Sequence, residues 1–176
     1  MADFKLAVAL VLKHEGGYQA NKADSGNYNS AGYLVGTNYG ISAKALEAFQ
    51  HYPPSREQMQ NLPQSTVIEI YRRNYWNRMK GDGFTSQPVA NIVFDFYVNA
   101  GIPALRILQR LVEVDQDGKI GPISLAAINK AEPEKLFEKY KQERKEYYER
   151  LVSRRPSSKA FLKGWLRRVN SFKYPQ

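Results

Sequence analysis

The sequence predicts a mainly helical (mainly α) fold with a small β-hairpin or irregular loop. Apolar residues recur at three- and four-residue steps through most of the chain, and serine, threonine and proline stand where those patterns begin. Glycine and polar residues crowd into residues 17–40, a stretch too rich in turn formers for a helix. The chain of 176 residues is long enough for a sizeable core. We expect two regions, 1–101 and 102–176, packed as one compact unit.

The first helix is predicted from about Asp3, its N-cap, to His14, because one face of this segment is apolar: Phe4, Ala7, Val8 and Val11. Two glycines end it and leave Glu15 at its C-terminus. The carbonyl groups there carry partial negative charge, so we expect the ionised form of Glu15 to be disfavoured. A carboxylic acid that keeps its proton near neutral pH can protonate a leaving sugar oxygen. Taken alone, the pattern is more typical of a solvated glutamate before a glycine cap.

The glycine-rich loop that follows should lie beside the Glu15 helix, with Tyr33–Val35 as a short strand. Ser42 is predicted to cap a helix that runs to about Gln50. Two later pairs have the spacing of a capping box: Ser55 with Gln58, and Thr66 with Glu69. The second pair should open a helix that runs to about Met79.

Three aromatic residues of this last helix, Tyr71, Tyr75 and Trp76, suit either core packing or sugar stacking. The most buried helix should begin at Pro88 and stop at Gly101. It carries Asp95 and Asn99, four residues apart, which need hydrogen-bond partners near the core. We favour a role in binding backbone groups of the glycine-rich loop over a place in a cleft.

The rest of the chain also reads as helices. One should run from Pro103 to Leu111 and another should begin at Pro122. Residues 114–122 between them form a turn rather than a calcium loop, because Lys119 and Ile120 stand where such a loop needs a ligand and a glycine. A long helix over about 133–152, a break at 155–158 and a final helix complete the chain.

Charge is unevenly distributed along the chain. Residues 1–134 hold 13 Lys+Arg and 13 Asp+Glu, whereas residues 135–176 hold 13 and 4, so the net charge of +9 arises in the last quarter. A partner that binds this basic segment would be anionic, either nucleic acid or the polymers and lipids of a bacterial envelope. The alternative, that this charge forms a solvated helix face that only aids solubility, has about the same weight as an anionic partner.

Cysteine is absent, which excludes disulfides, thiolate nucleophiles and cysteine zinc sites, and with only two histidines, His14 and His51, a histidine metal site is not expected. We therefore expect catalysis by carboxylates.

Seven segments recur in an order and spacing that can be compared with known families: His14–Tyr18, Asp24 with Gly26, Gly36–Ser42, Tyr71–Trp76, Phe94–Phe96 with Asn99 and Gly101, Asp117–Asn129 and Gly164–Arg168. Together they resemble glycoside hydrolase family 108, which comprises phage-type and secretion-associated N-acetylmuramidases, some called secretion activator proteins. Each segment is weak alone, but their order and spacing are specific and cover nearly the whole chain. Of the two acids that many members carry in the loop, only the second, Asp24, is retained here.

The resemblance implies a lysozyme-like fold whose 1–101 region is catalytic and whose 102–176 region is peptidoglycan-binding-like. It implies hydrolysis of the β-1,4 bond between N-acetylmuramic acid and N-acetylglucosamine, with Glu15 catalytic and Asp24 the best second carboxylate. We predict substrate contacts at Thr37, Asn38 and Tyr39, and also at Trp76 and Asn99. Peptidoglycan is the expected partner, with no metal or cofactor. The distance between the two carboxyl groups distinguishes a mechanism that inverts the anomeric configuration from one that retains it.

Two other classes of protein also fit the sequence. One is a lytic transglycosylase or a peptidoglycan-binding protein that does not cut, and the other, which we do not favour, is a nucleic-acid-binding protein. The apolar start of the chain does not read as a cleavable signal peptide, because Asp3 precedes the first lysine and no small-residue cleavage site follows. We expect cytoplasmic synthesis and release to the wall or periplasm by a holin, a secretion system or lysis.

Overall fold

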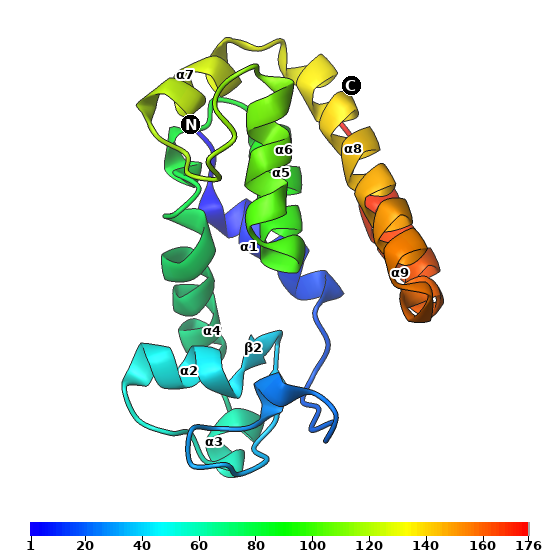
Figure 1. The fold of residues 1–176 in the computed structure, drawn as a ribbon. Helices are drawn as coiled ribbons and strands as arrows, with labels where there is room; N and C mark the ends of the chain where they lie inside the picture. Colours follow the sequence, from blue (N-terminus) through cyan, green and yellow to red (C-terminus); the bar gives the residue numbers. More distant parts are fainter. Residues whose placement is uncertain (176) are drawn as a thin grey trace. The chain divides into compact units, whose positions relative to one another are not determined.

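A computed structural model describes residues 1–175 as mainly helical, with a two-stranded antiparallel sheet (Figure 1). The predicted fold class, a lysozyme-like helical fold with a small hairpin, is confirmed. Contacts divide the chain into two compact units. The first comprises Val8–Asn74, and the second comprises Met1–Ala7 together with the chain from Tyr75 onward. This division by contacts falls within two helical segments.

The first unit holds most of α1 (Phe4–His14) and a series of short elements: η1 (Ser25–Asn27), β1 (Thr37–Asn38), β2 (Ile41–Ser42), α2 (Ala43–Gln50), α3 (Arg56–Gln60) and α4 (Gln64–Tyr71). The predicted caps are confirmed at α2 and α3. Ser42 Oγ accepts a hydrogen bond from Ala45 N, and Ser55 with Gln58 forms a complete capping box. The polar loop between α1 and α2 is therefore closed by a well-capped helix.

Two local predictions were wrong. Helix α4 begins at Gln64, with Pro63 at its N-cap position, so Thr66 lies inside the helix instead of opening it. It ends at Tyr71 and continues as a π-helical turn, Arg72–Trp76. The segment Tyr33–Val35 is not a strand; it makes one isolated bridge, between Leu34 and Tyr28. The hairpin strands are Thr37–Asn38 and Ile41–Ser42, because the tight turn between them fixes the register.

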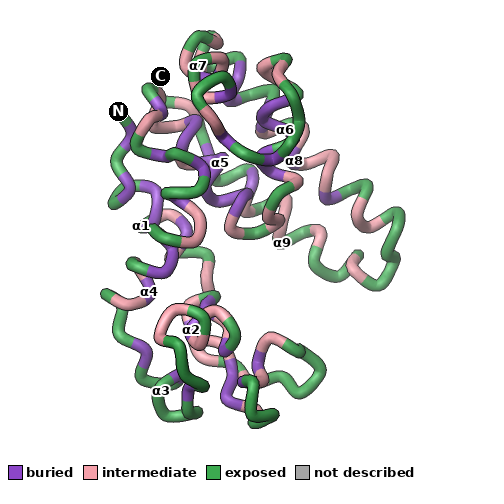
Figure 2. The backbone as a smooth tube through the Cα atoms, turned by 60° about the vertical axis from the view of Figure 1, so that its left-hand side comes forward, coloured by how far each residue is buried: buried purple, intermediate pink, exposed green. Residues whose placement is uncertain are grey.

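The second unit contains the helices that the sequence pattern indicated: α5 (Gln87–Ala100), α6 (Ile102–Leu111), α7 (Pro122–Lys130), α8 (Pro133–Arg154) and α9 (Lys159–Ser171), with short turns η3 (Gly81–Gly83) and η4 (Pro156–Ser158). Helix α5 is buried along most of its length, as Figure 2 shows, and packs against α6 and α8. Helix α9 lies beside α8 (Figure 1). Within the described residues, no helix is long and apolar enough to cross a membrane.

A buried ion cluster joins α5, α8 and α9. The carboxylate of Asp95, fully buried, accepts hydrogen bonds from Arg144 at 2.6 Å and from Arg168 at 2.7 Å. The Arg144 guanidinium also lies over the ring of Phe96, 5.0 Å from its centroid. Asp95 therefore binds arginines rather than backbone groups of the glycine-rich loop, which corrects the sequence-based assignment. Two cations of the basic C-terminal quarter are consequently internal and unavailable to an anionic partner.

Candidate active site

Glu15 stands one residue beyond α1, and its backbone N–H still donates to Val11 O at 3.1 Å. The residue is half-buried, whereas the two glycines after it are exposed. No helix turn therefore follows Glu15 to cover it. Its position at the helix end agrees with the sequence prediction.

The hairpin beside Glu15 turns through two residues, Tyr39 and Gly40, both with positive φ angles of 49° and 74°. Positive φ at both central positions defines a type I′ turn, which matches the twist of the flanking strands. Glycine adopts this conformation freely, but tyrosine does so at a cost. Such a strained residue persists only where the surrounding structure holds it, and strained residues are concentrated at functional sites.

Gly40 lies directly against the carboxylate of Glu15. A Cβ atom at Gly40 would stand 2.7 Å from Glu15 Oε2 and 2.5 Å from the hydroxyl oxygen of Tyr71. The Tyr71 hydroxyl donates a 2.9 Å hydrogen bond to Tyr39 O, and so ties α4 to the turn. Glu15, Gly40 and Tyr71 thus meet at one point. The sequence analysis named Glu15, considered Tyr71 only for core packing or sugar stacking, and assigned no individual role to Gly40.

Asn27, fully buried, organises the loop that leads into the hairpin. Its carbonyl oxygen accepts from Val35 N and Gly36 N at 2.8 and 2.9 Å, and its side-chain oxygen accepts from Thr37 Oγ1 at 2.6 Å. Asn27 Nδ2 donates to Gln19 Oε1 at 2.9 Å. Thr37, predicted to contact substrate, therefore uses its hydroxyl within this network. No sequence signal marks Asn27 beyond its place among turn formers.

Asp24 is exposed at the N-cap of η1, where its Oδ1 accepts from Gly26 N at 2.8 Å. Gly26 lies against Ser42, the last residue of β2, since a Cβ on Gly26 would stand 3.5 Å from Ser42 Cβ. Within the described residues, Asp24 Oδ2 has no hydrogen-bond partner. Asp24 and Glu15 therefore border the same hairpin, Asp24 at the Ser42 end and Glu15 at the turn.

The other predicted contact residues lie elsewhere. Asn38 is buried, and its side-chain N–H groups donate to Met59 O and Gln60 O of α3 at 2.9 and 3.2 Å. Asn38 thus anchors the hairpin to α3. Trp76 and Asn99 belong to the second unit.

Trp76 is fully buried against Phe4 and Phe94, which places it in the core instead of on a surface that faces a sugar. Its indole N–H donates to Asp82 Oδ1 at 2.7 Å. Asn99 is exposed and its side-chain oxygen accepts a hydrogen bond from Tyr148 of α8. Within residues 1–175, no three His, Cys, Asp or Glu side chains are grouped as a metal site requires.

Glycosidases that work through carboxylates need two acids beside the bond they cleave, and Glu15 and Asp24 border one hairpin. The family model described as glycosyl hydrolase 108 matches residues 8–101. The chain belongs to this family and is a glycoside hydrolase that acts on peptidoglycan. Residues 103–170 match a second family, described as "Predicted Peptidoglycan domain", which supports peptidoglycan as the partner.

The structure of SagA from Brucella abortus is similar to this chain throughout. The two sequences are 31% identical, the match covers 96% of this chain and 90% of SagA, and the TM-score is 0.77. No curated protein sequence matches the chain.

Proposed function

We propose that the protein hydrolyses the β-1,4 bond between N-acetylmuramic acid and N-acetylglucosamine, with Glu15 as general acid. The observation that carries this proposal is the contact of the Glu15 carboxylate with Gly40, beside the Tyr71 hydroxyl. Only a glycine leaves space for the carboxylate at this turn. Glu15 gives its proton to the glycosidic oxygen while the sugar ring acquires oxocarbenium character.

Asp24 supplies the second carboxylate in this proposal. Its exposed position and its unpartnered Oδ2 suit a group that must meet water or a sugar carbon. If Asp24 activates water, the product anomer is inverted, and if it attacks the anomeric carbon itself, the anomer is retained. Proton NMR of the first product formed assigns one of these two roles.

Tyr39 is the hairpin residue that we propose for direct substrate contact. It is half-buried at the turn, next to Gly40, and its strained backbone is fixed by Tyr71. Thr37 and Asn38 act through the shape of the hairpin in this account, because their side chains bond to Asn27 and to α3.

Digestion of purified peptidoglycan, followed by mass spectrometry of the fragments, tests the bond and the reaction class together. Our proposal predicts fragments that end in reducing N-acetylmuramic acid. Anhydro ends would identify a lytic transglycosylase, and reducing N-acetylglucosamine would identify cleavage of the other glycosidic bond. Binding without any release of fragments would make the protein a peptidoglycan-binding module.

We also propose that α9 contacts anionic polymers or lipids of the envelope. Residues 150–176 contain no Asp or Glu, and three exposed cations repeat every four residues on one side of α9: Lys159, Lys163 and Arg167. Substituting all three by glutamine should weaken binding to anionic vesicles and to wall polymers, and should flatten its salt dependence. Equal binding to DNA would favour a nonspecific basic surface.

A further inference from the structure

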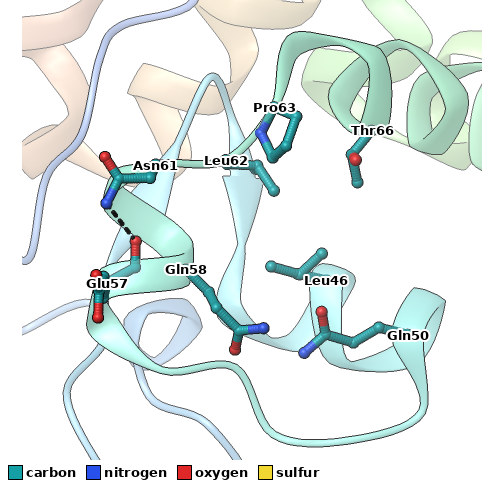
Figure 3. Close-up of a pocket in the computed structure, with 8 residues that line it drawn as sticks. All are labelled: Leu46, Gln50, Glu57, Gln58, Asn61, Leu62, Pro63 and Thr66. Carbon is teal, nitrogen blue, oxygen red and sulfur yellow. Dashed lines mark hydrogen bonds between the residues drawn. The ribbon is translucent and has the colours of Figure 1, made fainter.

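A pocket of about 350 Å³ lies between α2, α3 and α4 in the first unit, and no function is assigned to it (Figure 3). This volume falls near the lower end of the range for small-molecule sites, roughly 300–1,000 Å³. Leu46 and Leu62 point into it from opposite sides and are almost fully buried, so they form an apolar floor. Pro63 and Thr66 close the side toward α4 (Figure 3).

Two carboxamides face one another across this floor, as Figure 3 shows: Gln50 at the end of α2 and Gln58 in α3. Both are tied to Tyr52 in the loop between the helices. Gln50 Nε2 donates to Tyr52 O at 2.9 Å, and Gln58 Nε2 donates to the Tyr52 hydroxyl at 3.4 Å. Gln58 Oε1 is also held, by Ser55 N at 2.9 Å. The amides are therefore fixed in place before any ligand arrives.

Hydrogen-bonding capacity remains on both amides. Within residues 1–175, Gln50 Oε1 has no partner, and Gln58 Nε2 has a second N–H beyond the one given to Tyr52. One acceptor and one donor above an apolar floor match a secondary amide with a methyl group. The N–H of such a ligand donates to Gln50, its carbonyl accepts from Gln58, and its methyl group meets the two leucines.

Tyr52, which bonds to both of these amides, is 53% exposed. An exposed aromatic ring offers a flat apolar surface for the C–H face of a pyranose. We propose that this pocket is a saccharide subsite that binds the acetamido group of an N-acetylated amino sugar. This inference rests on the proposed function, since N-acetylated sugars make up the glycan that the enzyme cleaves.

The pocket is structurally joined to the active site. Asn38 of the hairpin bonds to Met59 O and Gln60 O at the end of α3, and the next two residues, Asn61 and Leu62, line the pocket. The hairpin that carries Gly40 and the pocket thus share α3. A glycan strand is a repeating polymer, so the subsite holds a sugar further along the strand than the bond that is cut.

Binding of a trimer of N-acetylglucosamine to the full chain, followed by NMR of the side-chain amides, tests the subsite. We expect the trimer to shift the Gln50 and Gln58 amide signals, and the de-N-acetylated trimer to leave them in place. Loss of one hydrogen bond in Gln50→Leu should raise the Kd about three- to tenfold. Tyr52→Leu should weaken binding separately, by removing the ring. The matched control Gln64→Leu, at an exposed position outside the pocket, should keep the wild-type Kd.

Three results would overturn the subsite: equal binding of both trimers, an unchanged Kd in both Gln50→Leu and Tyr52→Leu, or shifts caused by a wall stem peptide and not by the sugar. The urea midpoints of the variants confirm that they fold. Binding is measured without hydrolysis, which separates the two proposals. If the protein binds the trimer here but releases no muramic acid ends, the result contradicts the proposed function alone. If it cleaves the wall and the trimer does not shift these amide signals, the result contradicts the subsite alone.

Discussion

The hydroxyl of Tyr71 donates a 2.9 Å hydrogen bond to the backbone carbonyl of Tyr39, across 32 residues of sequence. This bond fixes the strained residue of the hairpin turn, and the turn in turn places Gly40 against Glu15. Tyr71 is buried, so its own hydroxyl is shielded from bulk water. The position of the acid therefore depends on a tyrosine that follows it by more than fifty residues.

Replacing Tyr71 by Phe should lower kcat about fivefold with little change in KM, because one hydrogen bond worth about 1 kcal/mol no longer holds the turn. Steady-state rates on soluble glycan fragments measure the effect. Tyr33→Phe is the matched control, since Tyr33 is exposed and its hydroxyl makes no hydrogen bond within the described residues. Equal loss in both variants would show that Tyr71 has no special role.

Replacing Gly40 by Ala should lower activity roughly 100-fold, since a displacement of about 1 Å at a reacting group costs that much. The new methyl would overlap Glu15 Oε2 at 2.7 Å, and a φ of 74° strains any residue with a Cβ. Gly164→Ala in α9 serves as control, because a Cβ there meets no atom within 4 Å. An active Gly40→Ala enzyme would mean that the carboxylate works from another position.

Most helices were predictable because their signals are local. Ser42 and the Ser55–Gln58 box mark the starts of α2 and α3 in the sequence itself, and both caps form. The hairpin was misplaced because Tyr33–Val35 is more strand-like in composition than Thr37–Asn38. The tight turn at Tyr39 and Gly40 decides the pairing, and a tyrosine with positive φ gives no sequence signal.

The candidate site was predictable only in part, and for a related reason. Glu15 was found from its place at a helix end, which neighbouring residues determine. The contacts of Gly40 with Glu15 and Tyr71 exist only after the chain folds. Periodicity also cannot separate an aromatic residue in the core from one that faces a sugar. Trp76 fitted both descriptions and lies in the core.

Replacing Asp95 by Asn should destabilise the protein by about 3–5 kcal/mol, because the cations of Arg144 and Arg168 would lose their counter-charge in a buried site. The free energy of unfolding, measured in urea, tests this. Glu143→Gln is a control at a more exposed ion pair on α8, where the change should stay below about 1 kcal/mol. Similar losses in both variants would contradict a central role for the buried cluster.

Stability should fall as the pH rises above 10. Burial raises the pKa of Tyr140 and of Tyr148 above the ordinary value of 10.0. Both tyrosines therefore keep their protons in the folded protein at a pH where the unfolded chain loses them, so the stabilisation is complete below pH 10 and is lost above it. Tyr140→Phe should make the decline between pH 9 and about pH 11 shallower. Tyr33→Phe should leave that slope unchanged, and an identical slope in Tyr140→Phe would contradict the prediction.

The most direct test of the central claim is the release of reducing N-acetylmuramic acid ends from purified peptidoglycan by wild-type protein and by Glu15→Gln, a substitution of nearly the same shape. We predict rapid release by the wild type, and a loss of at least about 100-fold in Glu15→Gln with an unchanged urea midpoint. A folded Glu15→Gln protein that releases these ends at the wild-type rate would show that another group donates the proton.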